Sequence, residues 1–263
     1  MLHTPVVCGR GCESKPPRTE RGVRLDAGFC AGRRQGADRP SGEVGTVTTR
    51  FVLWDLDGTL VDSSADITAA ANAARAGLGL EPLSERTVRG YVGEGAVRLM
   101  EQVLADAPAT LERGLSLFFD YYERHPVVHT RAYPGIDPLV RSLSGRQGIA
   151  TNKPGHLSRA VVEHLGWSAH FAAHVGAGDV PRRKPAPDAL RRALELAGVA
   201  PERAVFVGDS PIDVEAAAAA GLACIAVSWG LRPRHELTGA SVVVDTPMEL
   251  EEALLRLDDG WAC

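Results

Sequence analysis

Hydrophobic and polar positions divide the chain into short apolar runs and longer amphipathic stretches. The clearest run is Phe51–Trp54, which predicts a buried strand because aromatic and β-branched residues favour a pleated surface. Further short runs predict strands at 148–150, 175–177, 204–207, 224–227 and 242–244. Helical stretches separate these runs, at 138–143, 157–165, 187–196, 211–220 and 247–257. This alternation predicts an α/β fold with a doubly wound, Rossmann-like parallel sheet.

The stretch between the first strand and Tyr133 has a different pattern. Helical periodicity covers 65–78, 85–105 and 111–124, and no segment between them is a convincing strand. Tyr133, Pro134 and Gly135 mark the return to the core, because Pro and Gly stand where helical periodicity stops. We therefore expect a helical cap domain at 65–131, inserted into a core formed by 49–64 and 132–258.

The first 48 residues show no apolar periodicity and are rich in Arg, Gly and Pro. Such a segment cannot bury enough surface to offset the entropy of ordering, so we expect a disordered extension without a function of its own. An alternative is a zinc site made by His3, Cys8, Cys12 and Cys30, but their spacing fits none of the usual patterns.

Composition narrows the class of partner. The 263 residues are 44% hydrophobic, enough for an ordinary core, and a net charge of -4 gives no support for a nucleic-acid partner. No run approaches the roughly 20 apolar residues of a membrane span, and the N-terminus lacks the apolar core of a secretory signal. Five scattered cysteines make no disulfide framework. We expect a cytoplasmic protein with a small-molecule partner, as a monomer or homodimer.

Two carboxylates and a glycine follow the first strand. Asp55 and Asp57 lie at its carboxyl end, which is where ligands bind in an open α/β sheet. Gly58 lets the backbone turn sharply and approach a ligand closely. Taken alone, the stretch is more typical of an Asp-Gly turn with solvated acids.

Polar residues also follow later strands: Thr151, Asn152, Lys184, Asp209 and Asp213. Adjacent ends of parallel strands would gather these side chains with the first two acids into one crevice. At about 4 Å and an effective dielectric near 20, each pair of like charges costs about 4 kcal/mol. A divalent cation relieves that repulsion, and Mg²⁺ suits a site of carboxylates, a backbone carbonyl, water and a substrate phosphate.

The order DxDGT, TN, K and GDxxxD resembles the haloacid dehalogenase superfamily of phosphohydrolases, over about residues 50–258. The helical insertion resembles the C1-type cap of that superfamily. The resemblance implies that Asp55 is the nucleophile and forms an aspartyl-phosphate. It implies that Asp57 protonates the leaving oxygen and then activates water. This second acid is typical of phosphatases and phosphomutases, whereas the dehalogenases lack it.

The remaining roles also follow from the resemblance. Asp209 is expected to bind Mg²⁺ together with Asp55 and the main-chain carbonyl of Asp57. Asp213 is expected to support the metal directly, through water or through Lys184, which offsets the charge of the nucleophile and of the phosphoryl group. The phosphate itself is expected to contact Gly58, the Thr151 hydroxyl and Asn152.

Several words resemble the phosphoglycolate phosphatase group within the superfamily: DLDGTLVDS, YVGEGA, AYPGI, TNKP and KPAPDAL. Gly93 and Gly95 are expected to form a cap loop whose amides reach the substrate, with Glu94 or Arg98 adding polar contacts. The alternative is a Gly-x-Gly hinge that only breaks a helix. The resemblance thus implies a small, charged phosphomonoester such as 2-phosphoglycolate.

Other functions remain open at this point. Pyrophosphatases, sugar-phosphate phosphatases and β-phosphoglucomutase-like phosphotransferases share much of the pattern. A catalytically silent binding or regulatory protein could keep the same fold, although such a protein has no need of the nucleophile, the acid, the lysine and the metal acids.

Overall fold

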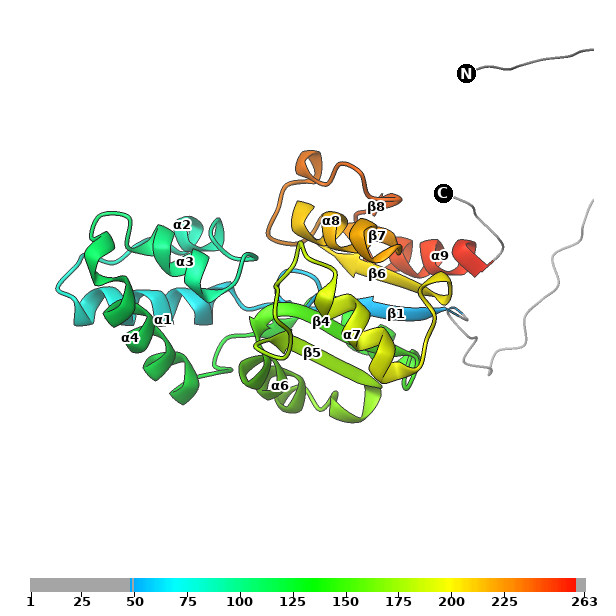
Figure 1. Cartoon of the computed structure of the whole chain (residues 1–263), viewed down its shortest axis with the longest axis horizontal. Coiled ribbons are helices and arrows are strands. Elements are labelled where there is room, and N and C mark those ends of the chain that lie inside the picture. Colours follow the sequence, from blue (N-terminus) through cyan, green and yellow to red (C-terminus); the bar gives the residue numbers. More distant parts are fainter. Residues whose placement is uncertain (1–47, 49, 259–263) are drawn as a thin grey trace, which may run out of the picture. The chain divides into compact units, whose positions relative to one another are not determined.

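The computed structural model describes residue 48 and residues 50–258. Its centre is a six-stranded parallel sheet in the order β5-β4-β1-β6-β7-β8 (Figure 1). The strands are β1 (Phe51–Trp54), β4 (Gln147–Pro154), β5 (Ala173–Ala177), β6 (Ala204–Gly208), β7 (Ala223–Val227) and β8 (Val242–Val244). The predicted α/β fold with a doubly wound parallel sheet is therefore confirmed.

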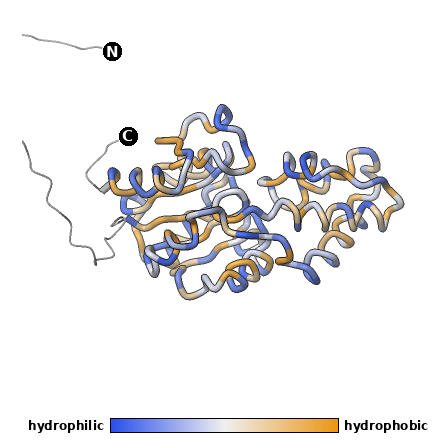
Figure 2. Tube along the Cα trace, turned by 180° about the vertical axis from the view of Figure 1, so that it is seen from behind, coloured by the Kyte–Doolittle hydropathy of each residue, from blue (hydrophilic) through white to orange (hydrophobic). Residues whose placement is uncertain are grey.

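Helices cover both faces of this sheet. Val52 and Trp54 of β1 belong to the apolar cluster with α5 (Ile136–Ser142), α6 (Gly155–His164) and α9 (Pro247–Asp258). Phe51 and Leu53 belong to the cluster with α7 (Asp188–Ala197) and α8 (Pro211–Ala220). Figure 2 shows hydrophobic positions along the strands and recurring along the helices. Buried on both faces, β1 holds the acids that follow it at a fixed edge of the sheet.

A helical insertion follows β1. It contains α1 (Ser64–Gly77), α2 (Glu85–Arg89), α3 (Ala96–Val103), the 3₁₀ turn Pro108–Thr110 and α4 (Leu111–Arg124) (Figure 1). These helices share an apolar core that includes Val88, Met100 and Phe118. The insertion is therefore a small packed unit, as the sequence predicted. Further 3₁₀ turns lie in the sheet core, at Ser168–His170, Pro201–Arg203 and Arg234–Glu236.

The single helix predicted at 85–105 is wrong. The structure ends α2 at Arg89 and begins α3 at Ala96, with a loop between them. Gly93 and Gly95 take φ angles of 120° and 88°, a region that disfavours other residues and cannot continue a right-handed helix. Two short helices and an intervening loop are the result.

The expectation that no strand lies between β1 and Tyr133 is also wrong. β2 (Val61–Asp62) and β3 (Arg131–Ala132) form a small antiparallel pair where the chain enters and leaves the helical insertion. Two residues are too few to show strand periodicity in a sequence. Their pairing joins the two connecting segments to each other.

The buried carboxylate of Asp66 in α1 strengthens this junction. It accepts hydrogen bonds from the backbone N–H groups of Val128, His129 and Thr130, and from the Thr130 hydroxyl at 2.7 Å. Burial opposes ionisation, but these hydrogen bonds outweigh it and lower the pKa of Asp66. An ionised side chain thus ties the outgoing segment to the first helix of the insertion.

The strand before Thr151 is longer than predicted, because β4 continues to Pro154. Gly148 lies within this strand. A Cβ at this position would lie 3.0 Å from Leu53 Cδ2 and 3.2 Å from the carbonyl oxygen of Ala173, so only glycine lets β1 and β5 pack so closely against β4. Thr151 and Asn152 are consequently strand residues, not a turn that follows a strand.

The predicted extension over residues 1–47 and the alternative zinc ligands lie outside the described residues. Within the described part of the chain, no helix combines the length and hydropathy that crossing a bilayer requires.

Candidate active site

A buried lysine holds two carboxylates at the carboxyl edge of the sheet. Asp55 follows β1, and its Oδ1 lies 2.8 Å from Nζ of Lys184. The same ammonium donates to Oδ1 of Asp213 at 2.7 Å. All three side chains are buried. Lys184 therefore fixes the orientation of the Asp55 carboxylate. The sequence predicted that these side chains would lie together in one crevice.

Asp213 is fixed by the start of α8. Ser210 is the N-cap residue and Pro211 the first helical residue, as the sequence predicted. Oδ2 of Asp213 accepts from the N–H groups of Asp209 and Ser210, both at 3.1 Å, and from the Ser210 hydroxyl at 2.6 Å. Both oxygens of Asp213 thus bind protein groups, so this residue orders the strand end and the lysine.

Asp209 sits between two glycines. A Cβ on Gly58, whose φ is 92°, would lie 2.2 Å from Asp209 Oδ2. A Cβ on Gly230 would lie 2.4 Å from the same oxygen. The N–H of Leu231 donates to this oxygen at 2.6 Å. The backbone at Gly58 therefore lies close to the Asp209 carboxylate, whereas the close approach that the sequence predicted was to a ligand.

The electrostatics of these acids favour a bound cation. Carboxylate oxygens of Asp55, Asp209 and Asp213 lie within 4.8 Å of one another. Burial, partly offset by Lys184, raises the pKa of Asp55 to about 6. Burial, reinforced by the charges of Asp213 and Asp55, raises the pKa of Asp209 well above its usual value. Three buried carboxyl groups share one ammonium here, so their ionised forms lack a counter-charge, and a divalent cation with an all-oxygen shell fits this donor set.

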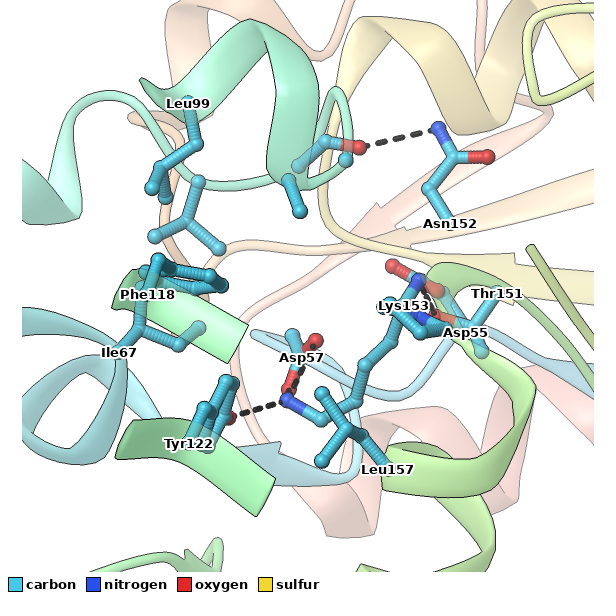
Figure 3. A pocket seen from close by; sticks show the side chains of 15 residues that line it. Asp55, Asp57, Ile67, Leu99, Phe118, Tyr122, Thr151, Asn152, Lys153 and Leu157 are labelled. Carbon is cyan, nitrogen blue, oxygen red and sulfur yellow. Dashed lines mark hydrogen bonds and ion pairs between the residues drawn. The ribbon is translucent and has the colours of Figure 1, made fainter. Parts of the chain in front are cut away.

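Asp57 lies beside a second buried lysine (Figure 3). Its Oδ1 accepts from the Ser63 hydroxyl at 2.5 Å and from Nζ of Lys153 at 3.1 Å. Lys153 also contacts the hydroxyl of Tyr122, at 2.6 Å. Burial opposes the charge of this lysine, but Asp57 and Tyr122 raise its pKa above the usual range. Tyr122 comes from α4, so this chain of contacts joins the sheet core to the helical insertion.

Thr151 and Asn152 lie at the same edge but differ in their contacts. The Thr151 hydroxyl oxygen accepts from the N–H of Lys153 at 3.2 Å, and the side chain lines a cavity above Asp55. The Asn152 amide donates to the carbonyls of Lys184 and Gly93, both at 3.1 Å, and accepts from the Lys184 N–H at 2.9 Å. Asn152 therefore connects β4, the lysine loop and the loop of the insertion.

The cavity lies between the sheet edge and the insertion. It measures about 40 Å³, room for only a few water molecules. The side chains that line it include, from the sheet core, Asp55, Asp57, Thr151, Asn152, Lys153 and Leu157, and, from the insertion, Ile67, Val92, Leu99, Phe118 and Tyr122. Most of the wall contributed by the insertion is apolar, so the cavity suits a small molecule.

Only some of the residues that the sequence predicted to reach the substrate from the loop between α2 and α3 lie at the cavity. Gly93 and Gly95 line the cavity, whereas the side chain of Glu94 is exposed and does not line it. Arg98 is also exposed and pairs with Glu101 at 2.8 Å. Main-chain groups of the loop face the cavity, and its charged side chains lie elsewhere.

Two arginines fasten the insertion to the sheet core. Arg89 of α2 donates to the carbonyl of Gly230 at 3.0 Å. Arg232 donates in the opposite direction, to the carbonyls of Gly90 at 2.7 Å and Val92 at 2.8 Å. These contacts hold the loop of the insertion over the strand ends.

Sequence reasoning missed Lys153, Ser63 and Tyr122 as site residues. A signal for Lys153 was present, because residues two apart in a strand share a face and Lys153 follows Thr151 at that spacing. Ending the strand at Ala150 hid it. The position of Tyr122 is typical of the buried face of α4, since it follows Phe118 by four residues, so its sequence gives no sign of a role in the site.

Comparisons with a family model, with curated relatives and with a solved structure all indicate the same family. The family model of the haloacid dehalogenase-like hydrolases matches residues 49–221. A phosphoglycolate phosphatase of Chromobacterium violaceum is 38% identical over 215 residues, which are 78% of this chain and 96% of the relative. One from Xylella fastidiosa is 35% identical, covering 84% of this chain and 98% of the relative. The solved structure of a haloacid dehalogenase-like family hydrolase from Streptococcus pneumoniae is 26% identical, and the match covers 79% of this chain and 99% of that chain with a TM-score of 0.69.

Proposed function

The chain belongs to the haloacid dehalogenase-like hydrolases, and from that premise we propose that it is an Mg²⁺-dependent phosphomonoesterase acting on 2-phosphoglycolate. One observation carries the proposal: a buried carboxylate, Asp55, is oriented by Lys184 at the mouth of a cavity that also holds Asp57. Two phosphoglycolate phosphatases that cover most of the chain support the choice of substrate.

In the proposed reaction the Asp55 carboxylate attacks phosphorus in line with the ester oxygen. The bond from phosphorus to the ester oxygen breaks, and the leaving alkoxide takes a proton from Asp57. Water then attacks the phosphorus of the aspartyl-phosphate, and Asp57 accepts the proton of that water. Phosphate leaves and Asp55 is restored.

Neighbouring side chains support both steps. Lys184 keeps Asp55 in position and offsets the negative charge that gathers on the transferring group. Ser63 and Lys153 orient the carboxyl of Asp57 toward the cavity. We assign phosphate binding to the Thr151 hydroxyl, and a positioning role to Asn152, whose amide is engaged by three main-chain groups.

We propose Asp55, Asp209 and the main-chain carbonyl of Asp57 as ligands of Mg²⁺, with Asp213 acting through Lys184. The ion supplies charge that stabilises the phosphoryl oxygens in the transition state. Gly58 then serves the metal site, because it makes room for the Asp209 carboxylate.

We further propose that residues 65–131 are a cap that closes over a core formed by 49–64 and 132–258. Closure excludes water from the nucleophile until the leaving group has departed. The small volume of the cavity and its apolar cap wall favour a short leaving group such as glycolate.

The test is phosphate release from 2-phosphoglycolate, pyrophosphate, β-glucose 1-phosphate and glucose 6-phosphate, each with Mg²⁺ and with EDTA. We expect the highest kcat/KM for 2-phosphoglycolate and no turnover in EDTA. Asp55→Asn is expected to lower kcat by more than about 10³-fold while the protein stays folded, because the nucleophile is lost.

Other outcomes of this panel would overturn the proposal. Isomerisation of the glucose phosphates without net phosphate release would indicate a phosphotransferase. A folded protein inactive on every ester would indicate a binding protein. Full activity of Asp55→Asn would remove the proposed mechanism.

A further inference from the structure

Lys153 brings a buried positive charge to the apolar part of the cavity. It is the one cationic side chain among the described residues that line the cavity. Its side chain is only 2% exposed. Burying an ammonium is costly unless every donor finds a partner, so the partners of this group indicate what the cavity is built to hold.

An ammonium has three N–H donors. Within the described chain, the contacts of Nζ are with the carboxylate of Asp57, at 3.1 and 3.3 Å to its two oxygens, and with the hydroxyl of Tyr122 at 2.6 Å. The two oxygens of the Asp57 carboxylate lie close together and at nearly equal distances from Nζ, so one N–H points between them, and the Tyr122 hydroxyl takes a second donor. The third donor belongs to a side chain that lines the cavity, and an anionic oxygen is the ligand that it binds most strongly.

We propose that Lys153 is a specificity-determining residue that binds the carboxylate of the leaving group, so that the enzyme selects phosphate esters of 2-hydroxy acids. This inference rests on the proposed function. It names the residue that distinguishes 2-phosphoglycolate from other small phosphomonoesters.

The spacing of Asp57 and Lys153 sets the length of the leaving group. The ester oxygen must lie within hydrogen-bond reach of Asp57, and Nζ lies only 3.1 Å from the same carboxyl. A carboxylate bound by Nζ must therefore be close to the ester oxygen. In the ester of a 2-hydroxy acid, the carboxylate is attached to the carbon that carries the ester oxygen, which meets this requirement.

The cap takes part through Tyr122. Its hydroxyl holds Nζ from α4, while its ring packs edge-on against Phe118 with a centroid distance of 5.5 Å. Tyr122 is thus a positioning residue that keeps the ammonium over the cavity when the cap is closed.

The experiment compares three substrates that differ in the leaving group alone. Ethyl phosphate has a methyl group where 2-phosphoglycolate has its carboxylate, and 3-phosphonooxypropionate carries the carboxylate one carbon further away. We expect the wild-type kcat/KM to be highest for 2-phosphoglycolate. In Lys153→Met, its kcat/KM relative to that of ethyl phosphate should fall roughly 10- to 100-fold, the value of one charge-assisted hydrogen bond.

The ratio of the two kcat/KM values separates recognition of the carboxylate from a general loss of activity, because loss of the contact between residue 153 and Asp57 lowers the activity on both esters. Tyr122→Phe should lower the same ratio by several-fold, chiefly through KM. Arg113→Met removes one exposed positive charge from α4, and we expect it to leave the ratio as in the wild type.

The outcomes distinguish this inference from the proposed function. A wild-type enzyme that hydrolyses both two-carbon esters equally well would overturn it. An unchanged ratio in Lys153→Met would do the same, and in both cases the phosphatase activity stands. No phosphate release from any ester by folded wild-type protein would instead overturn the proposed function.

Discussion

Replacing Gly58 by alanine tests whether this glycine exists to make room for Asp209. Gly58 has a φ of 92°, and a Cβ there would lie 2.2 Å from Oδ2 of Asp209. The carboxylate cannot simply retreat, because Gly230 approaches it from another direction and the N–H of Leu231 donates to it at 2.6 Å. Either the loop or the Asp209 side chain must move.

Two effects contribute to the cost. An alanine at positive φ costs about 1–2 kcal/mol. Moving Asp209 breaks a hydrogen bond to a charged acceptor, which contributes about 1.5–3 kcal/mol. We therefore expect Gly58→Ala to lower the free energy of unfolding by about 2.5–5 kcal/mol, a large part of a typical domain's stability.

The assay is urea unfolding combined with phosphate release as a function of Mg²⁺ concentration. Gly178→Ala is the matched control, because Gly178 has a φ of 93° and no atom within 4 Å of a Cβ added there. We expect the control to show the backbone cost alone, about 1–2 kcal/mol, with normal Mg²⁺ dependence. Gly58→Ala should also need at least 10-fold more Mg²⁺ for half-maximal activity. Equal destabilisation and equal Mg²⁺ dependence in the two variants would refute the reasoning.

Two further experiments address the acids. Asp66→Ala should lower the free energy of unfolding by about 2–4 kcal/mol at pH 7, because it leaves the N–H groups at Val128–Thr130 without their acceptor. The pKa of Asp66 is lowered in the folded protein, so its stabilisation is present above the unfolded pKa near 4 and is lost as the pH falls through the folded pKa. The difference between wild type and Asp66→Ala in urea unfolding should therefore narrow below about pH 4. A difference that stays constant with pH would contradict the role given to the ionised Asp66 carboxylate. Removing Mg²⁺ with EDTA should lower the melting temperature more at pH 7.5 than at pH 5. Burial raises the pKa of Asp55 to about 6, so the ionised form, which is the form proposed to bind Mg²⁺ and which destabilises the metal-free fold, prevails only above that pH. Equal shifts at both pH values in differential scanning fluorimetry would exclude this carboxylate from the metal site.

The sequence predicted most of the sheet because the strands are continuous apolar runs. Phe51–Trp54 is buried on both faces, so its boundaries are evident from hydrophobicity alone. Helix α8 was equally clear, since Ser210 and Pro211 mark its start and Gly221 follows its end. The acids at these strand ends could be grouped because parallel strands bring their carboxyl ends to one edge.

The features that sequence reasoning missed depend on tertiary contacts. Gly148 breaks strand propensity, yet the packing of Leu53 and Ala173 requires it. β2 and β3 are too short to have a period, and they form only because the two connecting segments meet. Lys153 owes its place in the site to the unexpected length of β4 and to Tyr122 from a distant helix.

The attachment of the cap and the choice of leaving group could have depended on the same side chains, but the contacts that attach the cap do not depend on side chains of the loop. Arg89, Arg232 and Asn152 all donate to main-chain carbonyls, at Gly230, at Gly90 and Val92, and at Gly93. Every residue type offers that acceptor, so side chains in the loop at 90–95 can be exchanged without loss of these contacts. Laboratory evolution at Val92, which lines the cavity from this loop, can therefore vary which leaving group is accepted while the fastening itself is inherited unchanged.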